Sequence, residues 1–246
     1  ISSYGEKRDA VVEGSADFAD GACAQLGQSA FIQKNDGYAY AGPWNPLETT
    51  GKMTMTMWLK WKENLGNWQV VTGKKDSDGE LYRLSIKPDE SLLNLGKSSG
   101  AKVFAPGPLP EGEWVFVAFT LDSTAAAPFG SIYMITEDEG LKASFSETSL
   151  GDKTNADFGV GSVRASSSFN GWLDDVRVYD DVLDQNSITT IYYQSCGKPV
   201  CNPDSLLFDT SGPNGEPDCI VNLYDYASLC LSWLDCSLLP SEACSN

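Results

Sequence analysis

The sequence predicts an all-β sandwich followed by a small, disulfide-rich tail. Several segments alternate apolar and polar residues with the period of two that is typical of β-strands with unlike faces. The 246 residues suffice for one such sandwich and a small appendage. Five of the seven cysteines lie after residue 200. Clustered cysteines in a segment too short to bury much apolar surface indicate disulfides and hence an oxidising compartment.

Composition excludes several classes of function. The net charge is −17, from 34 acidic and 17 basic residues, which argues against nucleic-acid binding and against attraction to anionic membranes. There is no histidine, which excludes Ser-His-Asp and Cys-His catalysis and histidine-ligated zinc. The longest apolar run, Trp114–Leu121, is far shorter than the roughly 20 residues of a membrane span. No signal peptide begins at Ile1, so we expect the mature form of a secreted protein.

The N-terminal part is predicted to contain a polar arm and then short strands. Residues 1–10 lack a clear period, and we interpret them either as a frayed terminus or as an arm that docks on a neighbouring subunit. Residues 11–40 contain short strands, among them Ser29–Ile32, and an Asn35–Gly37 turn signal.

The clearest strand is Met53–Trp61. Its methionines and Leu59 share one face, while Trp58 lies on the other and is expected to be a core anchor. Further strands are expected at 68–74, 81–86, 113–120, 131–136 and 158–161, with 91–95 as another candidate.

The segment Phe169–Tyr193 changes its period within itself. From Gly171 to Tyr179 it alternates as a strand, and beyond Tyr179 its apolar residues fit a short helix that Asp184 or Ser187 caps. Two acidic residues inside the strand, Asp174 and Asp175, have two readings. They are either calcium ligands near the sandwich loops or ion-pair partners of Arg177 or Arg164.

This segment, FNGWLDDVRVYDDVLDQNSITTIYY, resembles the closing signature of the laminin-G-like, concanavalin-type jelly-roll domains of bacterial secreted proteins. SAFIQKNDGYAY, MTMTMWLKW and EWVFVAFT are similar to earlier strands of the same family. The resemblance covers residues 11–195. It implies a two-sheet antiparallel jelly-roll sandwich, with residues 196–246 as a small calcium loop–helix appendage.

The tail sequence FDTSGPNGEPDCIVNLYDY resembles one calcium-loop half of the dockerin-like repeats that end many planctomycete secreted proteins. The resemblance implies a bound calcium ion, because such loops point alternate oxygens inward. Cys219 stands at loop position six, where glycine is usual. Either Asn214 or, in an enlarged loop, Asp209 is the first ligand. The full set of implied ligands is Asp209, Asn214, Glu216, Asp218, Ile220 through its carbonyl, Asn222 and Asp225.

A helix is expected over Leu223–Leu234, with an apolar stripe that must pack on another surface. Among the disulfide candidates, we expect Cys219 to pair with Cys236, and Cys201 with Cys244. Because the number of cysteines is odd, at least one thiol is free or pairs with another molecule.

These features favour a secreted, non-enzymatic adhesion or assembly protein that binds a glycan or an extracellular protein. The candidate platforms for stacking on sugar rings are Trp44, Trp61, Trp68 and Trp172. The alternative is a self-assembling subunit of an extracellular filament or surface layer, joined through the N-terminal arm, the tail helix or the odd cysteine. A glycoside hydrolase is the third reading, disfavoured because the E-x-D-x-x-E spacing of related hydrolases is absent.

Overall fold

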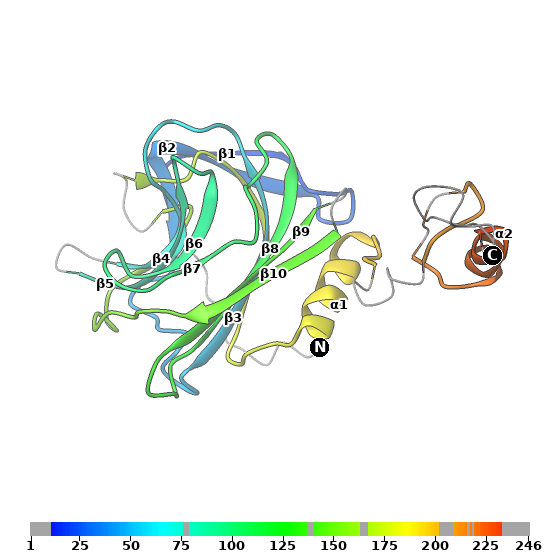
Figure 1. Ribbon diagram of the computed structural model, residues 1–246. Coiled ribbons are helices and arrows are strands. Elements are labelled where there is room, and N and C mark those ends of the chain that lie inside the picture. The colour runs from blue at the N-terminus through cyan, green and yellow to red at the C-terminus, as the bar shows by residue number, and fades with distance from the viewer. Residues whose placement is uncertain are drawn as a thin grey trace. The chain divides into compact units, whose positions relative to one another are not determined.

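A computed structural model describes residues 11–75, 79–136, 140–162, 167–201, 209–215, 217 and 219–232 (Figure 1). The chain forms two compact units, residues 1–199 and 200–246. The first unit contains the strands and one helix, and the second contains the other helix. The expected arm, residues 1–10, lies outside the described residues. No helix in the described ranges is long and apolar enough to cross a membrane.

The first unit is the expected antiparallel β-sandwich. Its described strands are β1 (Val11–Asp20), β2 (Gln28–Tyr40), β3 (Lys52–Trp61), β4 (Gln69–Lys75), β5 (Glu80–Lys87), β6 (Leu92–Gly96), β7 (Val103–Phe104), β8 (Trp114–Asp122), β9 (Phe129–Thr136), β10 (Gly140–Glu147), β11 (Phe158–Val160) and β12 (Gly171–Tyr179). The order is β10-β9-β8-β3-β12-β2 in one layer and β2-β11-β4-β5-β6-β7 in the other. Because β1 pairs along β2, each layer has seven strands within the described residues.

β2 connects the two layers. Its first half pairs with β12 at Phe31, and its second half pairs with β11 at Ala39. The predicted Asn35–Gly37 turn is wrong, because β2 runs through it as one strand. The register with β1 shifts at this point, from Ala16 opposite Ile32 to Gly14 opposite Gly37. Pairing with a neighbouring strand overrides the local turn signal here.

The core lies between the layers and begins with β3. Met53, Met55, Met57, Leu59 and Trp61 are all 0% exposed, as the alternation predicts. They meet the inward side chains of the neighbouring strands, which include Tyr82, Leu84, Ile86, Val115, Val117, Phe119 and Leu121. Each large apolar side chain buried here contributes about 1.5–3 kcal/mol.

The helix α1 (Gln185–Cys196) covers the other face of β3 and β8. The Asp184 carboxylate caps it by accepting the Ser187 amide at 2.8 Å, which confirms the predicted cap. Trp58, buried as expected, lies under the helix rather than between the sheets. Its indole stacks with Tyr192 at 5.3 Å and donates to Ser195 Oγ at 2.9 Å.

Candidate functional site

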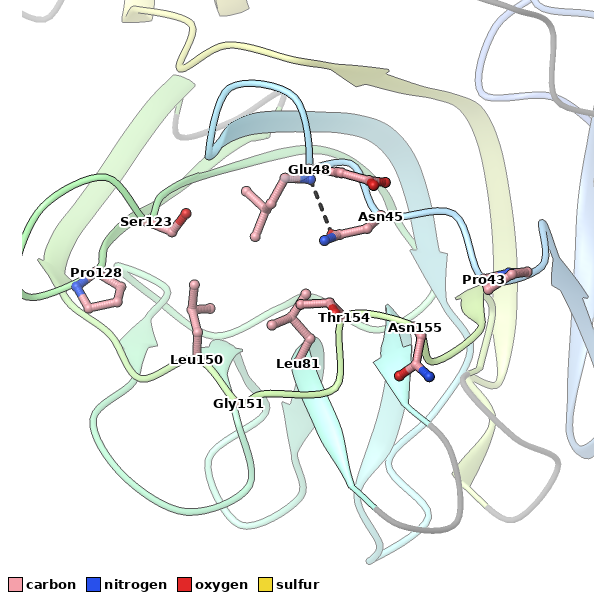
Figure 2. Close-up of a pocket in the computed structure, with 11 residues that line it drawn as sticks. Pro43, Asn45, Glu48, Leu81, Ser123, Pro128, Leu150, Gly151, Thr154 and Asn155 are labelled. Carbon is pink, nitrogen blue, oxygen red and sulfur yellow. Dashed lines mark hydrogen bonds between the residues drawn. The ribbon is translucent and has the colours of Figure 1, made fainter.

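The sandwich carries a cavity of about 710 Å³ where three loops meet (Figure 2), which we call the loop pocket. One loop joins β2 to β3, a second joins β8 to β9, and a third joins β10 to β11; β5 supplies one residue. The residues that line it are Pro43, Asn45, Leu47, Glu48, Leu81, Ser123, Pro128, Leu150, Gly151, Thr154 and Asn155.

The loop pocket combines apolar and uncharged polar side chains. Leu81 and Leu150 face Asn45 and Ser123 across the opening in Figure 2. Asn45 is 9% exposed and its Oδ1 accepts the Leu47 amide at 3.2 Å, which fixes the side chain in place. A few oriented polar groups among apolar walls are typical of small-molecule sites.

The buried Lys74 of β4 holds two of the pocket loops together. Its Nζ donates to the carbonyl oxygens of Pro43 at 3.2 Å, of Trp44 at 2.7 Å, and of Ala156. Burial lowers the pKa of Lys74 to about 8, although the charges of Asp157 and Glu48 act in the opposite direction. One ammonium group therefore joins the loop before β3 to the loop before β11.

Gly151 fixes the third loop against β5. Its N–H donates to the Leu81 carbonyl at 2.7 Å. A Cβ at this position would collide with the carbonyl oxygen of Glu80. Only glycine allows this close approach of two backbones, which brings Leu150 and Leu81 together at the pocket.

The four tryptophans predicted as ligand platforms have different surroundings. Trp61 is 0% exposed and donates to Gln69 Oε1 at 3.2 Å, so its prediction as a platform is wrong: it is part of the core. Trp44 is half-buried and packs edge-on against Phe158 at 5.3 Å. Trp68 is 38% exposed, with the Arg83 guanidinium 5.6 Å from its ring centre.

Trp172 lies on the outer face of β12, with its ring centre 4.8 Å from that of Phe31. It remains a predicted platform, as do Trp44 and Trp68. The residues of the loop pocket are not predicted by the sequence, because no periodic signal marks loop residues that meet only in the fold. The one usable signal was a Pro- and Asn-containing stretch, 43–46, directly before the clearest strand.

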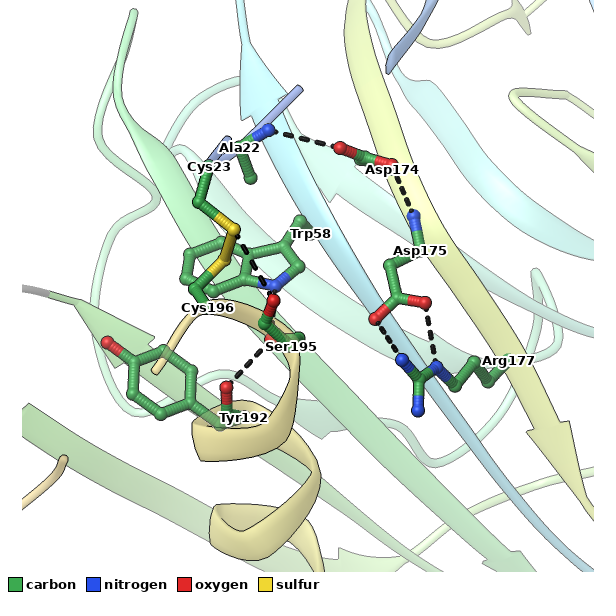
Figure 3. The surroundings of a disulfide bond; sticks show 9 residues. All are labelled: Ala22, Cys23, Trp58, Asp174, Asp175, Arg177, Tyr192, Ser195 and Cys196. Atoms are coloured by element: carbon green, nitrogen blue, oxygen red, sulfur yellow. Dashed lines mark hydrogen bonds and ion pairs between the residues drawn. A yellow bond between two sulfur atoms is a disulfide. The ribbon is translucent and has the colours of Figure 1, made fainter. Parts of the chain in front are cut away.

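The acidic pair of β12 is engaged within the fold (Figure 3). Asp174 accepts the amides of Ala22 at 3.0 Å and of Asp175 at 2.8 Å, and burial raises the pKa of Asp174. Asp175 accepts two hydrogen bonds from Arg177, at 2.7 and 2.8 Å. Of the two readings, the ion pair with Arg177 is therefore the one observed. Arg164 lies outside the described residues.

A disulfide between Cys23 and Cys196 lies beside this pair and ties α1 to the turn between β1 and β2. Cys196 therefore belongs to the sandwich unit, and the division at residue 196 was predicted slightly too early. In the tail unit, Cys219 is bonded to Cys201. The predicted pairs Cys219–Cys236 and Cys201–Cys244 are wrong, because each sulfur forms only one disulfide.

The tail unit brings two of the predicted calcium ligands together. Asp209 and Asp225 are 3% and 5% exposed. Asp225 Oδ1 accepts the amide of Thr210, next to Asp209, at 2.6 Å, and that of Ser211 at 3.0 Å. Its Oδ2 accepts the Asn222 amide at 2.7 Å. The amides of Asn222 and Ser211 lower the pKa of Asp225.

Asn222 and Asp225 also begin the helix α2 (Leu223–Ser232). Asn222 Oδ1 accepts the Tyr224 amide at 2.8 Å, and its Nδ2 donates to the Ile220 carbonyl at 2.9 Å. With the bond from the Asn222 amide to Asp225, this is a reciprocal capping box. Both residues therefore have a structural role, whatever else they bind.

The loop geometry distinguishes the two predicted first ligands. Asp209 Oδ2 accepts the Cys219 amide at 2.5 Å, whereas Asn214 is exposed. Cys219, at loop position six, has a φ of 69°, the left-handed conformation for which calcium loops use glycine. Among the described residues no group of three His, Cys, Asp or Glu side chains forms a metal site. The predicted ligands Glu216 and Asp218 lie outside those residues.

Comparison with solved structures shows similar folds. Domain 4 of AbnA, a GH43 extracellular arabinanase from Geobacillus stearothermophilus, in complex with arabinotriose, is 20% identical with a TM-score of 0.54, over 74% of this chain and 87% of that one. The binding domain of botulinum neurotoxin DC is 12% identical with a TM-score of 0.54, over 76% of this chain and 46% of that one. It is seen in complex with SialylT and, separately, with rat synaptotagmin II.

At these identities the likeness is one of fold. No match was found among curated proteins. The model of the Laminin_G_3 family, described as the concanavalin A-like lectin/glucanases superfamily, matches residues 33–189. This match covers more than half of the sequence and includes the strand β12 whose pattern carried the resemblance. The chain therefore belongs to the Laminin_G_3 family of the concanavalin A-like lectin/glucanases superfamily.

Proposed function

We propose that the protein is a secreted, non-enzymatic binding protein that holds an uncharged carbohydrate in the loop pocket. The observation that carries this proposal is the lining of the pocket, in which leucines alternate with amide and hydroxyl groups. A sugar presents apolar C–H faces and a rim of hydroxyl groups. Leucines match the first, and Asn45, Thr154 and Asn155 can donate to and accept from the second.

The charge of the pocket supports an uncharged ligand. Among the described lining residues only Glu48 is charged. Glycoside hydrolysis commonly requires two carboxyl groups on opposite sides of the scissile bond, and this lining supplies one. Binding without cleavage is therefore the function that the lining favours. The fold shared with an arabinotriose-binding domain agrees with a carbohydrate ligand.

The disulfides support secretion, because such bonds persist mainly in oxidising compartments. A calcium ion in the tail completes the proposal. Asp209 and Asp225 are both buried in the tail unit, and Thr210, the residue after Asp209, donates its amide to Asp225. Calcium would neutralise these charges and stabilise the loop.

The pocket is tested by titrating the purified protein with neutral oligosaccharides, arabinotriose among them, in a calorimeter. Asn45→Ala and Asn155→Ala should each weaken binding at least tenfold, because each removes a polar group from the lining. Asn67→Ala is the matched control, since Asn67 is exposed and bonds locally to the Leu65 carbonyl. Unchanged binding in both pocket variants, or no binding to any neutral oligosaccharide, would exclude this role.

A second candidate function is self-assembly through the tail, with a second copy of the chain as the partner. The observation that favours it is α2, where Leu223 and Leu231 are 81% and 84% exposed and the thiol of Cys230 is free and exposed. Sedimentation of the untreated protein, with and without reductant and EDTA, tests this candidate. A monomer under every condition would exclude it.

A further inference from the structure

A row of aromatic and basic side chains crosses the outer face of the first sheet. The paired positions are Phe31 on β2, Trp172 on β12, Lys60 on β3 and Trp114 on β8, and the exposed Asp17 on β1 pairs with Phe31 at the end of this row. Directly paired residues of neighbouring strands point to the same side of a sheet. The row faces away from the core, because the adjacent pair of Leu59 and Leu173 is buried in it.

The rings and the ammonium groups of this row lie close together. The ring centres of Phe31 and Trp172 are 4.8 Å apart. Lys60 Nζ lies 5.4 Å from the centre of the Trp172 ring, and Lys62 Nζ lies 5.6 Å from the centre of the Phe31 ring. The four residues Phe31, Trp172, Lys60 and Lys62 are called the aromatic–lysine surface below.

Within the part of the chain that the structure describes, neither ammonium group forms an ion pair with a carboxylate. No ion pair within the described ranges involves Lys60 or Lys62, although acidic residues outnumber basic ones 34 to 17 in the chain. Nearby carboxylates have other partners: Glu63 Oε1 accepts from Asn170 Nδ2 at 3.4 Å, and Glu111 Oε1 accepts the Asn64 amide at 2.9 Å. Unpaired cations on so acidic a protein are suited to an anionic ligand.

We infer that the aromatic–lysine surface is a second binding site and that it accepts an acidic polysaccharide, a chain of uronic acid units. The rings offer flat apolar faces to the sugar rings, and the two ammonium groups meet the carboxylates. The paired row spans three interstrand steps, roughly 14 Å at about 4.8 Å each. This length suits several sugar units of an extended chain, whereas the loop pocket suits a short uncharged ligand.

The alternative is that the lysines only stabilise the fold through cation–π contacts. The binding role and the fold-stabilising role predict different effects when the charges of Lys60 and Lys62 are removed. A fold-stabilising role predicts that removing both charges changes stability slightly and ligand binding not at all. A binding role predicts a loss of affinity for acidic chains with the fold intact.

The test is calorimetric titration of the full chain with oligogalacturonate, followed by the variant Lys60→Gln/Lys62→Gln. We expect its affinity to fall at least tenfold, and wild-type affinity to fall as the salt concentration rises. The matched control is Lys97→Gln/Lys102→Gln, which makes the same change of net charge on the segment between β6 and β7 and should bind as wild type. Equal losses in both variants, or none in either, would overturn the inference.

Three further measurements separate this site from others. Trp172→Phe keeps a ring and should bind oligogalacturonate more weakly than wild type while the thermal midpoint changes by only a few degrees. Poly-glutamate should bind less tightly than oligogalacturonate, and equal affinity would overturn the assignment to a sugar. Asn45→Ala should leave oligogalacturonate binding unchanged, so failure of the loop-pocket proposal and failure of this inference give different results.

Discussion

Replacing Lys74 by methionine tests whether one buried ammonium group organises the loop pocket. Methionine fills a similar volume without a donor. The change leaves the carbonyls of Pro43, Trp44 and Ala156 without the ammonium group that they share. Losing a donor costs at least about 1 kcal/mol for each buried carbonyl, and relief from burying a charge offsets part of this, so we expect a net loss of about 2 kcal/mol.

This loss is measurable. In a unit of this size, 2 kcal/mol corresponds to a fall in the melting temperature of about 4–8 °C. Lys75→Met is the matched control, because Lys75 is the next residue of β4 and is not fully buried. Hydrogen exchange should show faster opening of residues 43–51 in the Lys74 variant alone. Equal melting temperatures and equal exchange in wild type and Lys74→Met would refute the role assigned to this lysine.

The pKa of Lys74 adds a pH dependence with a definite sign. In the folded protein Lys74 titrates at about 8, below the ordinary value of 10.5. Between these two values the unfolded chain binds more protons than the folded chain, so Lys74 makes the folded state more stable as pH rises through this window. The stability difference between wild type and Lys74→Met should therefore widen between pH 8 and pH 10.5. Denaturant titrations measure it, and a narrowing difference would contradict the assigned pKa.

Three further predictions concern the tail, the disulfide and α1. Asp225→Asn should weaken calcium binding at least tenfold in a calorimetric titration, and identical isotherms would argue against the proposed ligand. Nearby amides lower the pKa of Asp225, so the ionised carboxylate stabilises the folded state at neutral pH. This stabilisation is lost as pH falls below about 4 and the carboxylate becomes protonated. Cys23→Ser/Cys196→Ser should cost about 5 kcal/mol in denaturant unfolding, since the bond closes a loop of 173 residues; a cost under about 1 kcal/mol would count against that role. Trp58→Phe removes the hydrogen bond to Ser195, so we expect the free energy of unfolding to fall by about 1 kcal/mol and hydrogen exchange in α1 to become faster. Unchanged exchange would show that packing alone holds the helix.

The parts of the fold that the sequence predicts are those with local signals. The strand β3 follows from its alternation, and α1 follows from a change of period after Tyr179 and from the cap Asp184. Both signals lie within about ten residues. The predicted turn at Asn35–Gly37 fails because β1 and β2 pair on both sides of it, which only the fold supplies. Its local signal remains as a shift in register between Gly14 and Ala16.

The parts of the site that the sequence does not predict depend on long-range contacts. The loop pocket joins residues 43–48 to residues 123–128 and 150–155, and no pattern in one loop specifies the others. The partner of Cys23 is equally remote in sequence. In the tail, the loop motif alone predicts Asp225 as a candidate calcium ligand. Only the folded loop distinguishes the two candidates for the first ligand: the Asp209 carboxylate accepts the Cys219 amide, and the next residue, Thr210, bonds to Asp225, whereas Asn214 is exposed.

The strand β12 explains why a short signature identifies this fold. Leu173 faces the core, and its neighbour Trp172 faces the outer surface beside Phe31. Gly171 permits the close approach to Lys60, because a Cβ there would collide with the Lys60 carbonyl oxygen. A slip of one residue would turn Leu173 outward and Trp172 inward, and would separate Asp174 from the Ala22 amide. Core, outer surface and N-terminal turn therefore all depend on one register.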